Sequence, residues 1–368
     1  MRIAIVGLGE AGAGIHLPSL RGLEQVELVG GADVDPERRQ AAARWRVPLF
    51  ADPAQLLADT KPDLVIIASP PRLHAAHCLA ALEAGAHVLC EKPFATSVRE
   101  AEGVLARAGV LGRQVAVNHE FRAMPIFQSV ANGIRNEGEG AAVMVQAWQL
   151  LDADPAHETG WRGQLHHRTL YEAGVHLVDL VLTLFGETPH AVRATVASGS
   201  ATAASRDAIV LVTLEFSRGR LAQIVQHRRH RGDRQYLEIR ADTPTASYRA
   251  SFGGRARLSA GLERSTRPTL RVEWGASGVA WREQGARRTM LARNPPSSLV
   301  IGTRAVTAAC LRALAEGRPV PYPATEGLDG LRVIAAAYLS AELGRTVALH
   351  GADAAAAASL PLGTESVG

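Results

Sequence analysis

The sequence predicts an α/β fold in two parts: an N-terminal doubly wound Rossmann domain, followed by a C-terminal α+β domain with a large, mostly antiparallel sheet. In roughly the first third of the 368 residues, short apolar runs alternate with amphipathic segments. That pattern is typical of a parallel sheet with helices on both faces. From about Pro189 onward, apolar and polar residues alternate strictly, which indicates antiparallel strands. A chain of this length also suits two domains better than one core.

The first domain is expected to span residues 1–121. Pro36 opens one of its helices, because proline is favoured at the first helical position, and Gly85 ends another. The expected strands are 2–9, 26–35, 62–71, 87–93 and 114–121, and the expected helices are 12–23, 36–45, 74–85 and 97–112.

The second domain is expected to span residues 122–350. The segment SRGR at 217–220 separates two alternating runs and therefore predicts a β-hairpin. The alanine-rich end of the chain, 351–368, is expected to be a flexible tail. The expected strands are 207–216, 221–229, 235–241, 269–275 and 279–285, and the expected helices are 169–186, 303–317 and 326–344.

Composition limits the classes of function. The chain is 47% hydrophobic and 21% charged, which is ordinary for a globular protein, and no apolar run reaches the roughly 18 residues that cross a bilayer. The net charge is +4, but the basic residues are scattered except for 227–234, which we expect to be a solvated edge strand. We therefore expect neither nucleic acid nor membrane as a partner. Cys78, Cys90 and Cys310 lie far apart in apolar segments, which predicts free thiols and a cytoplasmic location.

The segment GLGEAG at 7–12 places three glycines between the first expected strand and the first helix. Glycines there allow a tight turn and a close approach of a pyrophosphate to the helix N-terminus. Asp33, at the end of the second strand, can accept a hydrogen bond from a ribose 2′-hydroxyl. A 2′-phosphate about 5 Å from that carboxylate would cost roughly 3 kcal/mol, so we expect NAD rather than NADP. Arg38 and Arg39 are close enough in sequence to offset this repulsion, which leaves NADP open.

Lysine is rare in this chain, since Lys61 and Lys92 are the only two among 40 Lys and Arg residues. Lys92 follows an expected strand and precedes Pro93, which disfavours a helical backbone at the residue before it. Open α/β sheets bind their ligands at the carboxyl ends of the strands. An ammonium is also compact and loses its proton when desolvated, whereas a guanidinium does not. We therefore expect the amine of Lys92 to project into the cleft beside the cofactor.

Glu172, His176 and Asp179 fall at i, i+4 and i+7 on the expected helix 169–186, so they share one face. A polar stripe on an otherwise apolar helix is costly unless it is paired or faces a cleft. The alternatives are a solvated stripe and a metal site built on the Glu-x-x-x-His spacing, to which His166 and His167 could contribute. The spacing fixes no third ligand, and we expect no metal.

Four segments carry a resemblance to a known family: GLGEAG, PDLVIIASPPRLH, LEAGAHVLCEKP and GVHLVD. They are similar to segments of the glucose–fructose oxidoreductase, inositol dehydrogenase and rhizopine-catabolism family (Gfo/Idh/MocA). The resemblance implies a Rossmann domain with a C-terminal sheet domain, NAD(P)-linked oxidation or reduction of sugars and cyclitols, and a homodimer or homotetramer. It also implies that Lys92 contacts the reacting oxygen. The family has aspartate where Glu172 stands and a glycine triplet where this chain has HHRTL, so substrate identity does not transfer.

The expected catalytic residues are Lys92, Glu172 and His176. The expected cofactor contacts lie in the glycine loop and at the ends of the parallel strands: Gly7, Gly9, Glu10, Ala11, Gly12, Asp33, Ser69, Pro70, His74, Glu91, Lys92 and Asn118. Arg122 resembles the family's arginine after the fifth strand, and residues 160–162 resemble its loop over the cleft. The expected substrate contacts are Lys92, Arg122, Trp161, Arg162, Glu172 and His176.

The expected reaction moves a hydride between nicotinamide and a secondary hydroxyl or ketone of a sugar, cyclitol or related polyol. His176 takes the hydroxyl proton as general base, Glu172 orients the imidazole or binds substrate hydroxyls, and Lys92 stabilises the developing alkoxide. The proton-accepting roles of His176 and Lys92 can be exchanged. Two other functions stay open: an NAD-retaining, redox-assisted glycosidase or lyase, and a non-catalytic regulator that senses a dinucleotide. A regulator has no need of this proton-transfer set.

Overall fold

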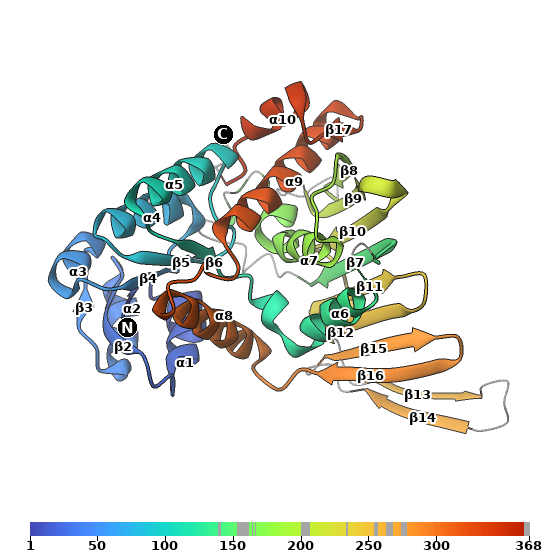
Figure 1. Ribbon diagram of the computed structural model, residues 1–368, viewed down its shortest axis with the longest axis horizontal. Coiled ribbons are helices and arrows are strands. Elements are labelled where there is room, and N and C mark those ends of the chain that lie inside the picture. Colours follow the sequence, from blue (N-terminus) through green and yellow to red (C-terminus); the bar gives the residue numbers. More distant parts are fainter. Residues whose placement is uncertain are drawn as a thin grey trace.

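In the described part of the chain, two large β-sheets are covered by helices, and a small two-stranded ribbon lies beside the larger sheet (Figure 1). The structure is a computed structural model that describes residues 1–138, 141–152, 162–163, 165, 167–199, 207–232, 235–253, 257–262, 268–273 and 278–363. The N-terminal sheet and its helices lie at one end of the molecule, and the larger sheet lies at the other.

The N-terminal sheet is parallel and has the strand order β3-β2-β1-β4-β5-β6, which confirms the predicted doubly wound domain. The order reverses between β1 and β4, and open sheets bind dinucleotides at such a point, beyond the carboxyl ends of the strands. Strand β3 is not among the predicted strands, because it is only two residues long. The strands are β1 Arg2–Val6, β2 Glu27–Ala32, β3 Leu49–Phe50, β4 Leu64–Ile67, β5 His87–Cys90 and β6 Val115–Val117.

Helices follow most of these strands, and side-chain caps fix where several of them begin. The Asp35 carboxylate accepts from the amide of Glu37 at the start of α2, and the Ser97 hydroxyl accepts from Glu100 at the start of α5. The helical segments are η1 Gly12–His16, α1 Leu17–Leu20, α2 Pro36–Ala42, η2 Ala43–Trp45, α3 Pro53–Thr60, η3 Pro71–Leu73, α4 His74–Glu83, α5 Val98–Leu111 and η4 Glu120–Ala123.

One face of this sheet is completed by a helix from the far end of the chain. Helix α8, Ser298–Ala315, packs beside α1 with Val306 and Cys310 in the same cluster as Ile3 and Ile5 of β1. Among the described residues, α8 is the one helix with the length and hydropathy to cross a membrane. Its packed face covers the sheet, which is the ordinary role of an apolar stripe on a core helix.

The second sheet has nine strands in the order β16-β15-β12-β11-β7-β10-β9-β8-β17. Its described pairings are antiparallel except for β7 with β10. The predicted hairpin is confirmed, since β9 and β10 pair antiparallel across residues 217–219. The strands are β7 Met144–Leu151, β8 Ala191–Ala197, β9 Ile209–Glu215, β10 Leu221–His227, β11 Gln235–Asp242, β12 Ser247–Gly253, β15 Val279–Gln284, β16 Arg287–Arg293 and β17 Val347–Ala348, and a separate ribbon joins β13 Arg257–Leu262 to β14 Pro268–Glu273.

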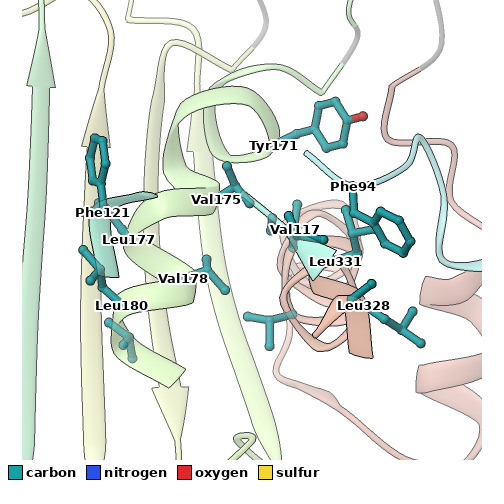
Figure 2. Close-up of a cluster of buried hydrophobic side chains, with 14 of the residues drawn as sticks. Phe94, Val117, Phe121, Tyr171, Val175, Leu177, Val178, Leu180, Leu328 and Leu331 are labelled. Atoms are coloured by element: carbon teal, nitrogen blue, oxygen red, sulfur yellow. The ribbon is translucent and has the colours of Figure 1, made fainter. Parts of the chain in front are cut away.

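Three helices cover one face of this sheet: α6 Pro125–Asn136, α7 Val175–Phe185 and α9 Ala324–Leu343. Figure 2 shows how α7 and α9 also join the two sheets, because Val175 and Val178 of α7 lie near Val117 of β6 and Leu331 of α9. These side chains belong to one buried cluster that extends from the parallel sheet to the large sheet. A shared core of this kind fixes α7 relative to the ends of the parallel strands.

The end of the chain differs from the expected flexible tail. Residues Gly351–Ala358 form helix α10, which packs on α9. After it, the Leu362 side chain is fully buried and its amide donates to the Thr96 carbonyl at 2.9 Å. An alanine run is a good helix former, and the apolar surface of α9 gives it a place to pack.

Candidate active site

A cavity of about 560 Å³ lies between the carboxyl ends of the parallel strands and α7. Its wall includes residues 9–11 of the glycine loop, Ser69 and Pro70 after β4, Lys92 after β5, and His176 of α7. The structure therefore brings the predicted lysine, which follows β5 of the parallel sheet, and the predicted histidine of α7 to one cavity. That cavity also reaches the predicted cofactor loop.

The glycine loop is built so tightly that two of its positions admit no side chain. Gly7 has φ +95°, and a Cβ there would lie 2.5 Å from the backbone of Ala68 and Ser69. A Cβ on Gly12 would lie 1.9 Å from the Gly7 carbonyl oxygen. These glycines let β1, η1 and the loop after β4 meet, so that the backbone of residues 9–11 forms the cavity wall. A dinucleotide pyrophosphate needs such a backbone cradle, and the residues present fit it.

Asp33 lies beside this loop, where its carboxylate accepts from the amides of Leu8 and Asp35 at 2.8 and 2.9 Å. Of the two arginines that could offset its charge, Arg38 faces the cavity, with Nη1 3.7 Å from Asp33 Oδ2. Arg39 instead donates to the backbone carbonyl of Asp33 at 2.6 Å. A guanidinium beside the carboxylate that is expected to bind the ribose weakens the expected discrimination against a 2′-phosphate.

His74 ties together the loops that follow β4 and β5. Its ring nitrogens lie 2.8 Å from the carbonyl oxygens of Ser69 and Pro93. Burial lowers the pKa of His74, although these carbonyls and the charge of Glu91 oppose the shift. His74 and Ser69 line the cavity as expected of cofactor contacts, and His74 also holds the cofactor-facing loops in register.

Glu91 is a buried carboxylate at the centre of a hydrogen-bond network. Its Oε1 accepts from Asn118 Nδ2 at 2.7 Å and lies 2.8 Å from His16 Nε2, while its Oε2 accepts from the Lys92 amide at 3.1 Å. Burial alone would raise the pKa of Glu91, but the hydrogen bond and charge of His16, with the charge of Lys92, lower it on balance. Glu91 therefore positions the backbone of Lys92. No local pattern indicates His16 as a site residue, because its partner Glu91 is distant in the chain.

Lys92 reaches from the end of β5 to the opposite wall of the cavity. Its Nζ donates to the backbone carbonyl of Glu172 at 3.4 Å. The amine thus lies at the junction of the two sheets, where the sequence predicts it, and it faces the cavity shared with His176.

The expected helix 169–186 begins as a π-helix, η7 Thr169–Gly174, and continues as α7. Each π-turn changes the phase of the side chains, and such turns are frequent at functional sites. Glu172, His176 and Asp179 consequently have separate partners rather than forming one stripe. Glu172 faces arginines, His176 faces Glu120, and Asp179 faces Arg122.

Three guanidinium groups surround the Glu172 carboxylate, those of Arg162, Arg168 and Arg228, at 2.7, 2.9 and 3.1 Å. Burial opposes ionisation, but the charges of Arg228 and Arg168, with Arg162, lower the pKa of Glu172 to about 2. Among the described residues the Glu172 carboxylate contacts these cations, so no contact supports its expected role in orienting the imidazole. The expected solvated edge at 227–234 is wrong for its first residues. His227 ends β10, which is an inner strand between β7 and β9, and the Arg228 side chain is buried beside the cavity.

Arg122 and Trp161, two of the expected substrate contacts, are not among the described residues of the cavity wall. Arg122 forms a two-pronged ion pair with Asp179, at 2.8 Å through Nε and 2.7 Å through Nη2, and also pairs with Glu326. It is absent from the described cavity wall, so we assign it a structural role and no longer a substrate contact. Trp161 lies outside the described residues. Arg162 does line the cavity.

His176 sits in a pocket that keeps its ring fixed and neutral. Its ring stacks on Phe121, with the ring centres 3.9 Å apart and the planes 9° from parallel. Burial, helped by the positive charge of Lys92 and by His119, holds the pKa of His176 well below its ordinary value. The free imidazole therefore persists at neutral pH with a lone pair that can accept a proton.

Comparison with known proteins bears on both halves of the chain. Residues 1–119 match the sequence profile described as an oxidoreductase family with an NAD-binding Rossmann fold, and residues 127–247 match the GFO/IDH/MocA C-terminal domain. The chain belongs to the Gfo/Idh/MocA oxidoreductase family. The two matched domains correspond to the parallel sheet and to much of the large sheet. As a member of that family, the chain is an NAD-binding oxidoreductase.

Several family members are similar over nearly the whole chain. D-apiose dehydrogenase from Paraburkholderia graminis is 29% identical over 356 residues, covering 93% of this chain and 88% of the relative. Scyllo-inositol 2-dehydrogenase (NADP(+)) from Bacillus subtilis is 25% identical over 371 residues, covering 95% and 96%. An oxidoreductase from Agrobacterium radiobacter, solved with NAD+, L-tartaric acid and magnesium, has a TM-score of 0.80 at 17% identity, covering 95% of this chain and 98% of that one. This last similarity concerns the fold.

Proposed function

We propose that this oxidoreductase interconverts a secondary hydroxyl and a ketone on a sugar, cyclitol or related polyol, with NAD(H) as its redox cofactor. The observation that carries the proposal is the meeting of Lys92 and His176 in one cavity that begins at the glycine loop. The similar dehydrogenases of D-apiose and scyllo-inositol point to the same substrate class.

The residues of this chain divide the work of the reaction. Bound NAD+ would supply the acceptor for the hydride of the carbinol carbon. His176, neutral and facing the cavity, takes the hydroxyl proton, and the Lys92 ammonium donates a hydrogen bond to the same oxygen as it gains negative charge. Residues 9–11, Ser69 and Pro70 would hold the dinucleotide. Arg162 lies where it can contact the hydroxyls of a polyol.

A substrate panel tests this proposal. Purified protein is mixed with NAD+ or NADP+ and with D-apiose, scyllo-inositol, free aldoses, glycosides or sugar acids, and the nicotinamide absorbance is followed. We expect turnover with at least one polyol or sugar and none with simple monoalcohols. No response across the panel would contradict the proposal. Protein that carries NAD through purification and cleaves a glycoside without added cofactor would indicate the redox-assisted glycosidase or lyase, and binding without any chemistry would indicate the regulator.

We further propose a cytoplasmic homo-oligomer. Cys78, Cys90 and Cys310 are buried free thiols, which suits a reducing compartment. On the large sheet, Leu211 of β9 pairs with Val225 of β10, which pairs with Trp148 of β7, and the Leu211 side chain is 44% exposed. This apolar row faces away from the covering helices, where a second copy would bury it. Light scattering should give at least twice the monomer mass, and Leu211→Glu should lower it.

A further inference from the structure

Glu120 lines the cavity, but the proposed reaction of Lys92 and His176 does not use it. It follows β6 on η4, its residue is only 5% exposed, and it contributes to the cavity wall. Its Oε1 lies 3.9 Å from Nε2 of His176, while its Oε2 has no hydrogen-bond partner among the described residues. A buried carboxyl without a partner is costly, so its retention calls for a function.

The backbone around Glu120 is held rigidly. The next residue, Phe121, stacks on the His176 ring, so η4 positions both the carboxyl and the imidazole that it faces. From the other side, α8 approaches so closely that a Cβ on Gly302 would lie 2.5 Å from the Glu120 carbonyl oxygen. Glu120 is therefore fixed from two elements, as a group that exchanges protons with a neighbour must be.

We propose that Glu120 is the proton-exchange partner of His176, a positioning and proton-holding residue of the proposed reaction, on which this inference rests. In the oxidation direction the substrate O–H bond breaks and its proton goes to Nε2 of His176. That proton then passes to Oε1 of Glu120, whose carboxylate becomes a carboxyl. The electron pair of the substrate C–H bond leaves with the hydride to NAD+. Reduction reverses each transfer, and the proton returns to the new alkoxide.

The charges around the pair favour a proton on Glu120 rather than on His176. Glu91, after β5, places a negative charge near Glu120, and burial together with Glu91 raises the pKa of Glu120 to about 8, although Lys92 opposes the shift. Lys92 and His119 disfavour the imidazolium of His176. Asp179 of α7, which is paired with Arg122, also raises the pKa of Glu120. His16 of η1 is hydrogen-bonded to Glu91, and α8 contributes Gly302 and Thr303.

The distance between the two groups suits an exchange that occurs during turnover. A shift of about 1 Å brings Nε2 and Oε1 to hydrogen-bond distance, and catalytic contacts commonly tighten by such amounts when substrate binds. Glu120 also explains how a histidine of low basicity can work in both directions, because its carboxyl, with a pKa near neutrality, holds the proton between steps.

Glu120→Gln tests the proposal, because the amide has the shape of the protonated carboxyl but cannot carry its proton. With the best substrate of the panel, kcat for ketone reduction by the wild type should fall as pH rises through about 8, and kcat for oxidation should rise. The variant should lose this inflection and at least about a hundredfold in kcat, with KM changed less than about threefold. Glu24→Gln, at an exposed position remote from the cavity, is the matched control and should behave as wild type.

Either of two kinetic results would overturn the proposal. One is an inflection near pH 8 that survives in Glu120→Gln, and the other is a kcat of Glu120→Gln within threefold of wild type. If Glu120→Gln does not fold, Glu120→Asp keeps an acid and should keep the inflection at a lower rate. Difference infrared spectroscopy of wild-type protein, without substrate, should show a protonated carboxyl that ionises as pH rises through about 8. Glu120→Gln should lack this signal, which distinguishes it from Asp179, whose pKa burial raises to about 7. Absence of that signal also overturns the assignment. An inactive panel with the infrared signal present would refute the proposed function and leave Glu120 as the proton-holding group.

Discussion

The Nζ atom of Lys92 lies 3.4 Å from the backbone carbonyl oxygen of Glu172, so a side chain from the parallel sheet contacts the segment that carries the site histidine. This contact crosses the boundary between the two sheets at the cavity. A carbonyl partner orients the ammonium without neutralising it, which leaves its charge available to a substrate oxygen.

We predict that Lys92→Ala lowers kcat at least about a hundredfold, because the developing alkoxide loses its charged donor. NAD+ affinity, measured by protein fluorescence, should change less than about tenfold. Lys61→Ala is the control, since Lys61 is the other lysine of the chain and lies exposed after α3. Turnover by Lys92→Ala within tenfold of wild type would contradict the role assigned to this amine.

Arg38 should govern the choice between cofactors. It lies 3.7 Å from the Asp33 carboxylate and is half-exposed, so solvent screens much of its charge. We expect Arg38→Ala to lower kcat/KM for NADP+ about tenfold while changing that for NAD+ less than threefold. Arg135→Ala, on the exposed side of α6, should leave the ratio unchanged. An unchanged ratio in Arg38→Ala would show that the guanidinium does not face the 2′ position.

Gly12 and Gly14 provide a matched pair within η1. A Cβ on Gly12 would overlap the Gly7 carbonyl, whereas a Cβ on Gly14 would meet nothing within 4 Å. We expect Gly12→Ala to destabilise the protein by about 2 kcal/mol or more and to weaken NAD+ binding. Gly14→Ala should stabilise it by roughly 0.5–1 kcal/mol, because glycine is a poor helix former. Thermal unfolding and NAD+ titration measure both effects, and equal behaviour of the two variants would refute the tight-turn account.

Glu172 should make the free energy of unfolding depend on pH in the acidic range. Its folded-state pKa is about 2, below the ordinary 4.5, so its carboxylate stabilises the fold above pH 4.5 and this contribution is lost as pH falls from 4.5 to 2. The loss should be of order 3 kcal/mol in the free energy of unfolding. Urea titrations of wild type and Glu172→Gln across this range give the measurement. The variant should be less stable near neutral pH and show a flatter profile, and parallel profiles would count against the arginine cluster.

The sequence predicts those strands and helices that are determined by local patterns of apolar and polar residues. The parallel strands appear as short buried runs, and alternation identifies β9, β10 and β11. The helix α3 carries readable signals that the sequence analysis does not use, since Asp52 caps it and Pro53 opens it. By contrast, no local pattern says that α8 covers the first sheet or that the alanine-rich end packs on α9, because both depend on surfaces formed by distant segments.

The site was predictable to a similar extent. Lys92 and the glycine loop follow from their places at strand ends and from the scarcity of lysine, and His176 follows from its spacing on the expected helix 169–186. The sequence misassigns the partners of Glu172, because residues 169–174 form a π-helix and because Arg228, which follows the inner strand β10, pairs with this carboxylate. The sequence could have indicated Glu120 as a site residue, because it follows β6 at the same sheet edge as Lys92. Its closeness to His176, however, requires the two sheets to be placed together.

The position of α8 also constrains how the chain can be made. On the ribosome, the dinucleotide-binding half emerges first, but Ile3 and Ile5 are covered only once residues 298–315 have been synthesised. Until then one side of the early sheet stays open to solvent or to chaperones. A recombinant fragment that stops at residue 121 should therefore aggregate, whereas the same fragment mixed with a synthetic α8 peptide should become more soluble.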